Sequence, residues 1–176
     1  GMNKTPLLAA LLAAAALLSA CSKEEAPASS SSSTAAGPAA QTSQAVTVEA
    51  IQSDAQGFTV GSPMSARTVY VFFDAQCPHC SQLWYAAKPL KTQAKFVWIP
   101  VRLLNDNSAS QASAILAAKD PVAAMDEHEA SMTDHKGGIQ AQGNLDAQRA
   151  AVKKNTELFN KFGFNSVPSL VTKNAA

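Results

Sequence analysis

The chain has 176 residues, a formal net charge of +1 and only 15% charged residues, which allows one domain of ordinary size. A chain this close to neutral has no excess of positive charge to attract nucleic acid, so we expect no nucleic-acid partner. Three cysteines are too few for a disulfide scaffold and, without further ligands, too few for a cysteine-only zinc site. Alanine, about a fifth of all residues, raises the 47% hydrophobic share, so the core is poorer in large side chains than this share suggests.

The first 20 residues are typical of a signal peptide. Lys4 precedes an unbroken run of leucine and alanine over residues 7–18, which as a helix of about 18 Å is too short for a hydrocarbon core of about 30 Å. The run ends in Leu-Ser-Ala-Cys21, which resembles the lipobox of bacterial lipoproteins. This resemblance implies that residues 1–20 are removed and that Cys21 is acylated. Ser22 after it implies anchoring to the outer membrane of a Gram-negative cell.

Residues 21–44 are rich in serine, alanine and proline and contain almost no large apolar side chain. Such a segment cannot bury enough surface to fold, so we predict a lipidated, disordered tether. As a flexible coil it has a root-mean-square reach of roughly 25–30 Å. The folded domain is then predicted to occupy residues 45–176.

The predicted domain opens with two short apolar segments. Residues 46–51 are compatible with a strand or a helix, and residues 58–60 favour a short strand. Residues 68–73 are β-branched or aromatic throughout. This pattern is typical of a strand that is buried on both faces, so we predict a central, parallel strand.

A helix and a second buried strand are predicted to follow. Residues 78–90 have apolar side chains at helical spacing, and Pro89 is expected to kink this helix. Residues 96–103 predict the strand, with Pro100 at its edge or at a bulge. Strand, helix and strand together make a βαβ unit.

Residues 108–132 are predicted to form two helices. Ser108 or Ser110 is expected to cap the first, and Asp120 and Pro121 to cap and start the second.

A longer helix is expected over residues 145–162, capped by Asn144 and stopped by Gly163. Residues 170–172 predict the beginning of a last strand.

Cys77-Pro78-His79-Cys80 lies where the first buried strand gives way to a helix. A helix N-terminus presents unpaired N–H groups and about half a positive charge, which stabilises a thiolate at Cys77. Pro78 suits the first helical position, and a protonated His79 would add positive charge beside the sulfur. Cys80 is close enough to form a disulfide but faces inward. We therefore predict that Cys77 is the attacking thiol and Cys80 the resolving thiol, and that this redox-active pair needs no further cofactor.

This motif, together with Pro89 and Val167-Pro168, resembles the thioredoxin fold of the periplasmic Dsb proteins, and most closely the DsbG/DsbC branch. Residues 114–121 and 128–131 resemble the helical insert of DsbG, and residues 88–91 its first-helix kink. The resemblance implies an α/β, thioredoxin-like fold with a helical insert at about residues 106–143.

The resemblance also implies a function: a periplasmic thiol-disulfide oxidoreductase with Cys77 and Cys80 as its catalytic pair. Its partners would be client proteins with cysteines, including singly sulfenylated ones, and a DsbD-type membrane reductant would recycle it. The Val167-Pro168 peptide bond is expected to be cis and to form the substrate-side wall of the site.

Three features depart from the DsbG/DsbC pattern. Residues 45–66 are too few for the dimerisation domain and linker helix of those proteins, so we expect a monomer. The Pro-His dipeptide and Val167 resemble DsbA, so a DsbA-like oxidant with a DsbB-type partner stays open as the alternative. Finally, Ala176 follows soon after the last strand begins, whereas the thioredoxin fold continues with a strand and a helix; this favours a C-terminally truncated sequence.

A metal-binding module is the competing class, since Cys77, Cys80 and a histidine could hold zinc or copper(I). One Cys-X-X-Cys supplies only two ligands, and we predict no metal.

Several other residues have both a structural and a functional interpretation. Asp74 is expected to be a loop residue rather than a proton acceptor. Val71 stands where thioredoxin and DsbA place a buried acid, so no carboxylate is expected beneath Cys80. Trp84 and Tyr85 could line a groove for clients, but we expect them to pack on the face of their helix. His128 and His135 are expected to be ordinary exposed histidines without a special role.

Overall fold

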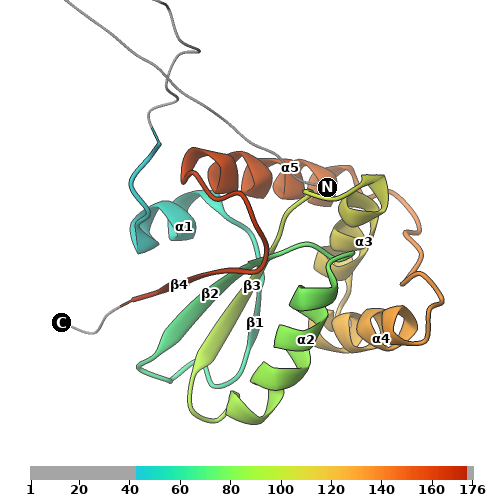
Figure 1. The fold of residues 1–176 in the computed structure, drawn as a ribbon, viewed down its shortest axis with the longest axis horizontal. Coiled ribbons are helices and arrows are strands. Elements are labelled where there is room, and N and C mark those ends of the chain that lie inside the picture. The colour runs from blue at the N-terminus through green and yellow to red at the C-terminus, as the bar shows by residue number, and fades with distance from the viewer. Residues whose placement is uncertain (1–42, 174–176) are drawn as a thin grey trace, which may run out of the picture. The chain divides into compact units, whose positions relative to one another are not determined.

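The computed structural model describes residues 43–173, which form a four-stranded mixed sheet with helices on both faces (Figure 1). The strands are β1 (Phe58–Val60), β2 (Thr68–Phe73), β3 (Lys95–Pro100) and β4 (Ser169–Thr172), in the order β1-β3-β2-β4. β2 and β3 are parallel neighbours at the centre, as predicted, and β1 and β4 pair antiparallel to them on the outside.

Five α-helices surround the sheet: α1 (Val48–Asp54), α2 (Pro78–Ala87), α3 (Asp106–Ala117), α4 (Pro121–Thr133) and α5 (Asp146–Lys161). α1 and α5 cover one face, and α2 covers the other (Figure 1). α3 and α4 lie between β3 and α5 in the chain and occupy much of the expected helical insert.

Strand β2 separates two apolar cores because its side chains alternate between the faces of the sheet. Phe72 packs toward α5, where its ring meets those of Phe159 and Phe162 at centroid distances of 6.1 Å. Phe73 points to the other face, beside the edge-to-face pair of Trp84 and Trp98 at 5.1 Å. All four residues from Tyr70 to Phe73 are buried, which confirms the prediction of a strand covered on both faces.

Several predicted boundaries are wrong by a few residues. The ambiguous segment 46–51 forms helix α1, and the Thr47 hydroxyl caps it by accepting from the Ala50 N–H. The second buried strand ends at Pro100 rather than at residue 103. The Val101 N–H still donates to the Phe73 carbonyl, but the next three N–H groups donate to the side chains of Thr156 and Asp74. Pro89 does not kink a continuing α-helix; α2 ends at Ala87, and Lys88–Leu90 form a 3₁₀ turn.

The expected caps of the later helices also need correction. Neither Ser108 nor Ser110 caps α3: Asn105 does, and Ser108 is its partner in a capping box. Asp120 and Pro121 start α4 as predicted. α5 begins at Asp146, one residue later than expected, and its N-cap is Leu145, which makes no side-chain capping hydrogen bond. The expected Asn144 cap is therefore wrong, although the Asn144 side chain accepts the Asp146 N–H at 3.0 Å.

Gly163 follows α5 with a φ of +77°, as expected for a helix stop that favours glycine.

The predicted signal peptide, the lipidation site Cys21 and all but the last two residues of the predicted tether lie outside the described residues. Within residues 43–173, no helix is both long enough and apolar enough to span a bilayer.

Candidate active site

The Cys-Pro-His-Cys motif joins the end of β2 to the first turn of α2. Cys77 is the N-cap of α2, and its sulfur accepts a hydrogen bond from the Cys80 N–H at 3.4 Å. Pro78 occupies the start of the helix, where it has no N–H to leave unpaired, and both Pro78 and His79 are exposed. Cys77 retains 7% exposure and Cys80 none, so a reaction partner meets Cys77 first.

The Val167-Pro168 peptide bond is cis and lies beside this motif. The Cys77 sulfur is 3.7 Å from the Val167 carbonyl oxygen, although the two residues are 90 positions apart. The structure thus brings all six sequence-predicted site residues together: Cys77, Pro78, His79, Cys80, Val167 and Pro168.

The two cysteines, both free in this structure, differ in their surroundings. Burial raises the pKa of the Cys80 thiol far above its ordinary value. The hydrogen bond with Cys77 and the charges of Cys77 and Asp74 act in the same direction, and a hydrogen bond with the Asp74 backbone only partly offsets them. Cys80 is therefore a neutral thiol near pH 7, whereas the Cys77 sulfur has a donor aimed at it. This asymmetry agrees with Cys77 as the attacking group.

Asp74 is fully buried and holds the loop before the motif in place. One carboxylate oxygen accepts the Gln76 N–H at 2.8 Å, and the other accepts the N–H groups of Leu103 and Leu104 at 2.7 and 2.9 Å. These bonds support the expected role as a loop residue, because all three join the carboxylate to backbone N–H groups of the surrounding loops. The expectation that no carboxylate lies near Cys80 is wrong, since the charge of Asp74 acts on that thiol.

His128 is fully buried, so its predicted exposure is wrong, whereas His135 is exposed as expected. The Nε2 atom of His128 lies 2.6 Å from the Ala75 carbonyl oxygen, and Nδ1 accepts the Ile139 N–H at 3.2 Å. This pattern places the single proton of a neutral ring on Nε2. Burial lowers the pKa of His128, partly opposed by its hydrogen bond to Ala75 and by the charge of Asp74.

The helical insert is therefore tied to the active-site loop. Besides the His128 contact, the Gln76 side-chain amide donates to the Gln111 side chain, and Gln111 in turn donates to the Gly137 carbonyl at 2.8 Å. Gly138 has a φ of +94°, and a Cβ there would lie 2.5 Å from His128 Cε1, so only glycine fits.

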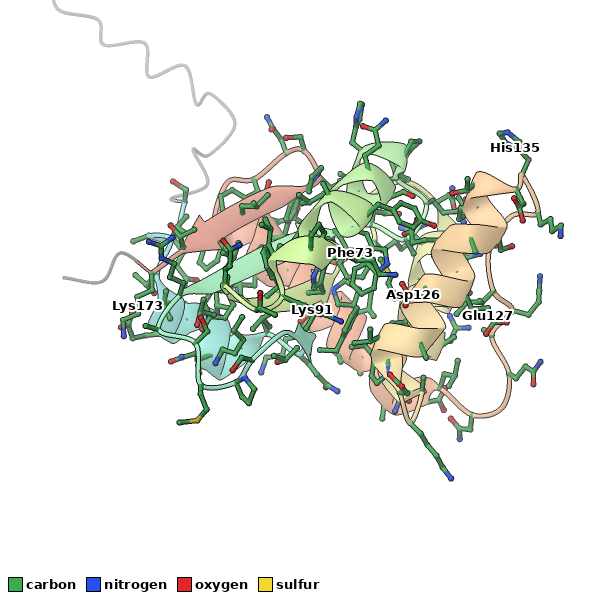
Figure 2. The ribbon with its side chains drawn as sticks, turned by 90° about the horizontal axis from the view of Figure 1, so that it is seen from below. Phe73, Lys91, Asp126, Glu127, His135 and Lys173 are labelled. Atoms are coloured by element: carbon green, nitrogen blue, oxygen red, sulfur yellow. The ribbon has the colours of Figure 1, made fainter. Side chains whose placement is uncertain are left out.

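Helices α2 and α4 contact each other through side chains. Trp84 is buried, which confirms the packing interpretation, and its indole N–H donates to Asp126 at 2.8 Å. Asp126 also pairs with Lys88 at 2.5 Å, on the side of α4 that faces the body of the domain (Figure 2). Tyr85 is exposed, contrary to the packing interpretation.

Glu129, on the same helix, is a buried carboxyl group that is not among the residues predicted from the sequence. The spacing of Met125, His128 and Glu129 on α4 is the signal that could have found a buried face there.

Across residues 43–173, no three histidine, cysteine or acidic side chains come close enough together to hold a metal ion.

Comparison with known proteins agrees with this geometry. A family model described as thioredoxin matches residues 53–175. The chain is 31% identical over 121 residues to the thiol:disulfide interchange protein DsbG of Pseudomonas aeruginosa, covering 65% of this chain and 45% of that protein. It is 34% identical over 110 residues to DsbC of Haemophilus influenzae, covering 59% of this chain and 43% of that protein. The chain thus spans less than half the length of these curated relatives.

Among solved structures, the catalytic domain of Proteus mirabilis ScsC aligns with a TM-score of 0.56 at 19% identity, covering 70% of this chain and 81% of that domain. At that identity the likeness supports the fold alone, and it confirms the predicted thioredoxin-like α/β class. The chain belongs to the thioredoxin family, and within it resembles the thiol:disulfide interchange proteins DsbG and DsbC.

Proposed function

We propose that this chain is a DsbG-like thiol-disulfide oxidoreductase that exchanges disulfides or reduces oxidised cysteines of client proteins through Cys77 and Cys80. The placement of the Cys77 sulfur carries the proposal: it caps α2, accepts the Cys80 N–H at 3.4 Å and lies 3.7 Å from the carbonyl before cis-Pro168. The names of the DsbG and DsbC relatives support it.

The chemistry follows from the difference between the two sulfurs. With a client disulfide, the Cys77 thiolate attacks one client sulfur, and the other client sulfur leaves as a thiolate and takes a proton from water. Cys80 then gives its proton to water and attacks Cys77, which releases the first client sulfur as a thiolate and leaves a Cys77–Cys80 disulfide. With a client sulfenic acid, the Cys77 thiolate attacks the client sulfur, and the hydroxyl group takes a proton from the solvent and leaves as water. Cys80 again resolves the mixed disulfide. In both cases a DsbD-type membrane reductant would restore the dithiol.

The cellular setting is part of the proposal: a monomer in the periplasm, held at the outer membrane by acylated Cys21. Replacing Cys21 by Ser removes the acylation site, so the protein is expected to move from the membrane pellet to the soluble periplasmic fraction. Fractionation and immunoblotting of cells that express each form would measure this. Retention of Cys21→Ser in the pellet would contradict the lipid anchor.

The alternative direction, a DsbA-like oxidant with a DsbB-type partner, is favoured by one observation: Pro78 and His79 between the two cysteines are exposed, and Val167 lies beside Cys77. Stabilising the Cys77 thiolate stabilises the reduced form, which makes the disulfide more oxidising. We therefore expect a standard potential above that of thioredoxin, which is about −270 mV. Because the proposed DsbD-type reductant would restore the dithiol, we also expect the pair to be mostly reduced in cells.

Equilibration with glutathione measures the potential, and alkylation of acid-quenched cells measures the cellular state. A potential below that of thioredoxin would contradict a stabilised Cys77 thiolate. A fully oxidised pair in cells would favour the oxidant.

A further inference from the structure

A four-residue turn from Asp74 to Cys77 joins β2 to the active-site motif. The Cys77 N–H donates to the Asp74 carbonyl at 3.0 Å, which closes the turn and leaves Ala75 and Gln76 as its two central residues. These two residues set the direction in which the chain enters α2. They therefore also set where the Cys77 sulfur lies relative to the Val167 carbonyl, 3.7 Å away.

Both central residues of this turn are held by the helical insert. His128 on α4 donates from Nε2 to the Ala75 carbonyl at 2.6 Å, across 53 positions of the chain. The Gln76 side-chain amide donates to the Gln111 side chain on α3, and it also lies 3.8 Å from the Met132 sulfur on α4. Two helices of the insert thus hold adjacent residues of one turn.

A single loop completes the contacts of His128 and Gln111 on the side away from the turn. The Ile139 N–H donates to His128 Nδ1 at 3.2 Å, and the Gln111 amide donates to the Gly137 carbonyl at 2.8 Å. Gly138 packs between them, because a Cβ there would lie 2.5 Å from His128 Cε1 and 2.6 Å from Gln111 Nε2. Neither side chain can turn away from the active-site turn without breaking these contacts.

The burial of His128 is unusual for a residue that only fills space. Its side chain is fully buried, and burying a polar ring costs free energy unless its nitrogens are hydrogen-bonded. Both nitrogens are bonded here, and one of the two bonds goes to the turn that precedes Cys77. An apolar side chain could fill the same volume, but it could not hold the Ala75 carbonyl.

We propose that His128 is a positioning residue: by holding the Ala75 carbonyl, it keeps the Cys77 sulfur in line with a client sulfur that lies against Val167. This inference rests on the proposed function and gives the helical insert a part in the reaction. Thiolate attack requires a close, aligned approach to the client sulfur. A displaced Cys77 sulfur therefore reacts more slowly with a client seated on Val167, whereas a small disulfide can turn to meet it.

Two amide substitutions separate the contact with Ala75 from the burial of the ring. The Gln amide of His128→Gln reaches about as far as Nε2 and can donate to the Ala75 carbonyl. The shorter Asn amide of His128→Asn reaches only about as far as Nδ1, so it can serve Ile139 but not Ala75.

The reduced full-length proteins are each mixed with a peptide whose single cysteine is disulfide-bonded to glutathione, and formation of the Cys77–Cys80 disulfide is followed by acid quenching and mass spectrometry. His128→Gln should react within about threefold of the wild-type rate, and His128→Asn about tenfold more slowly than wild type. With oxidised glutathione in place of the peptide, all three proteins should react at similar rates.

Asn155→Ala is the control for a general loss of stability. Asn155 is fully buried on α5, and its side chain bonds to Gln56 and to the Pro100 carbonyl, not to the active-site turn. This variant should unfold at lower urea concentration without slowing the peptide reaction. Gly138→Ala displaces His128 and Gln111 from the outside, should slow the peptide reaction, and decides the test if His128→Asn does not fold.

Equal peptide rates for wild type and His128→Asn would overturn the inference and leave the proposed function intact. The inference would also be wrong if His128→Gln or Asn155→Ala were as slow as His128→Asn, or if the slowing were the same with oxidised glutathione. A wild-type chain that reacts with neither disulfide would instead refute the proposed function, and this inference with it.

Discussion

Replacing Cys77 by Ser is expected to abolish thiol-disulfide exchange and to leave no client covalently attached. Cys77 is the only cysteine of the pair with any exposed surface, and the carbonyl before cis-Pro168 lies beside it. Cys80→Ser retains the attacking sulfur but removes the resolving one, so mixed disulfides with clients should accumulate. Non-reducing gels of cells that express each variant would measure both effects.

The double variant Cys77→Ser/Cys80→Ser is the control for nonspecific capture in this experiment. Adducts that form with Cys77→Ser and not with Cys80→Ser would reverse the two roles. The strongly raised pKa of Cys80 argues against that outcome, because a neutral, fully buried thiol is a poor initial nucleophile.

Asp74→Ala is expected to destabilise the fold by about 3–5 kcal/mol. The substitution removes the acceptor of three N–H groups, from Gln76, Leu103 and Leu104, and leaves a cavity in their place. Urea denaturation monitored by circular dichroism would give the free energy of unfolding.

Asp134→Ala is a matched control, because the Asp134 side chain is 65% exposed and has only a 4.0 Å contact with Lys136. Its effect should stay below about 0.5 kcal/mol. A loss of less than about 1 kcal/mol for Asp74→Ala would show that the three amides find water instead, and that the carboxylate does not hold the loop.

The features that could be predicted from the sequence are those that depend on residues close together in the chain. Residues 68–73 predict a doubly covered strand because both alternate sets are apolar, and the structure buries Tyr70 through Phe73. The cysteine motif is equally local, since a proline after Cys77 marks a helix start. Val167-Pro168 was found through a family resemblance, because no local pattern ties it to a cysteine 90 residues away.

The parts that could not be predicted depend on contacts between distant segments. His128 stands among charged residues and reads as exposed, yet its partner is the Ala75 carbonyl 53 residues earlier. The predicted β3 is too long because Val101 and Leu103 are apolar on either side of Arg102, whereas the N–H groups of Leu103 and Leu104 bond to the Asp74 carboxylate and not to the sheet. Both errors have the same cause. When a buried polar group is hydrogen-bonded by a residue from a distant segment, its own stretch of sequence shows no periodic pattern that reveals the burial.

The cap at the start of α2 has a consequence for how folding and electron transfer depend on each other. The sulfur that accepts the Cys80 N–H is the same atom that must bond to Cys80 upon oxidation. An N-cap contributes on the order of 1 kcal/mol to a helix, so the folded dithiol and the folded disulfide cannot be equally resistant to unfolding unless other changes compensate. By a thermodynamic cycle, that difference equals the difference in redox free energy between the folded and unfolded chain. Any solvent or substitution that loosens the first turn of α2 therefore also shifts the balance between thiol and disulfide, even if it touches neither sulfur.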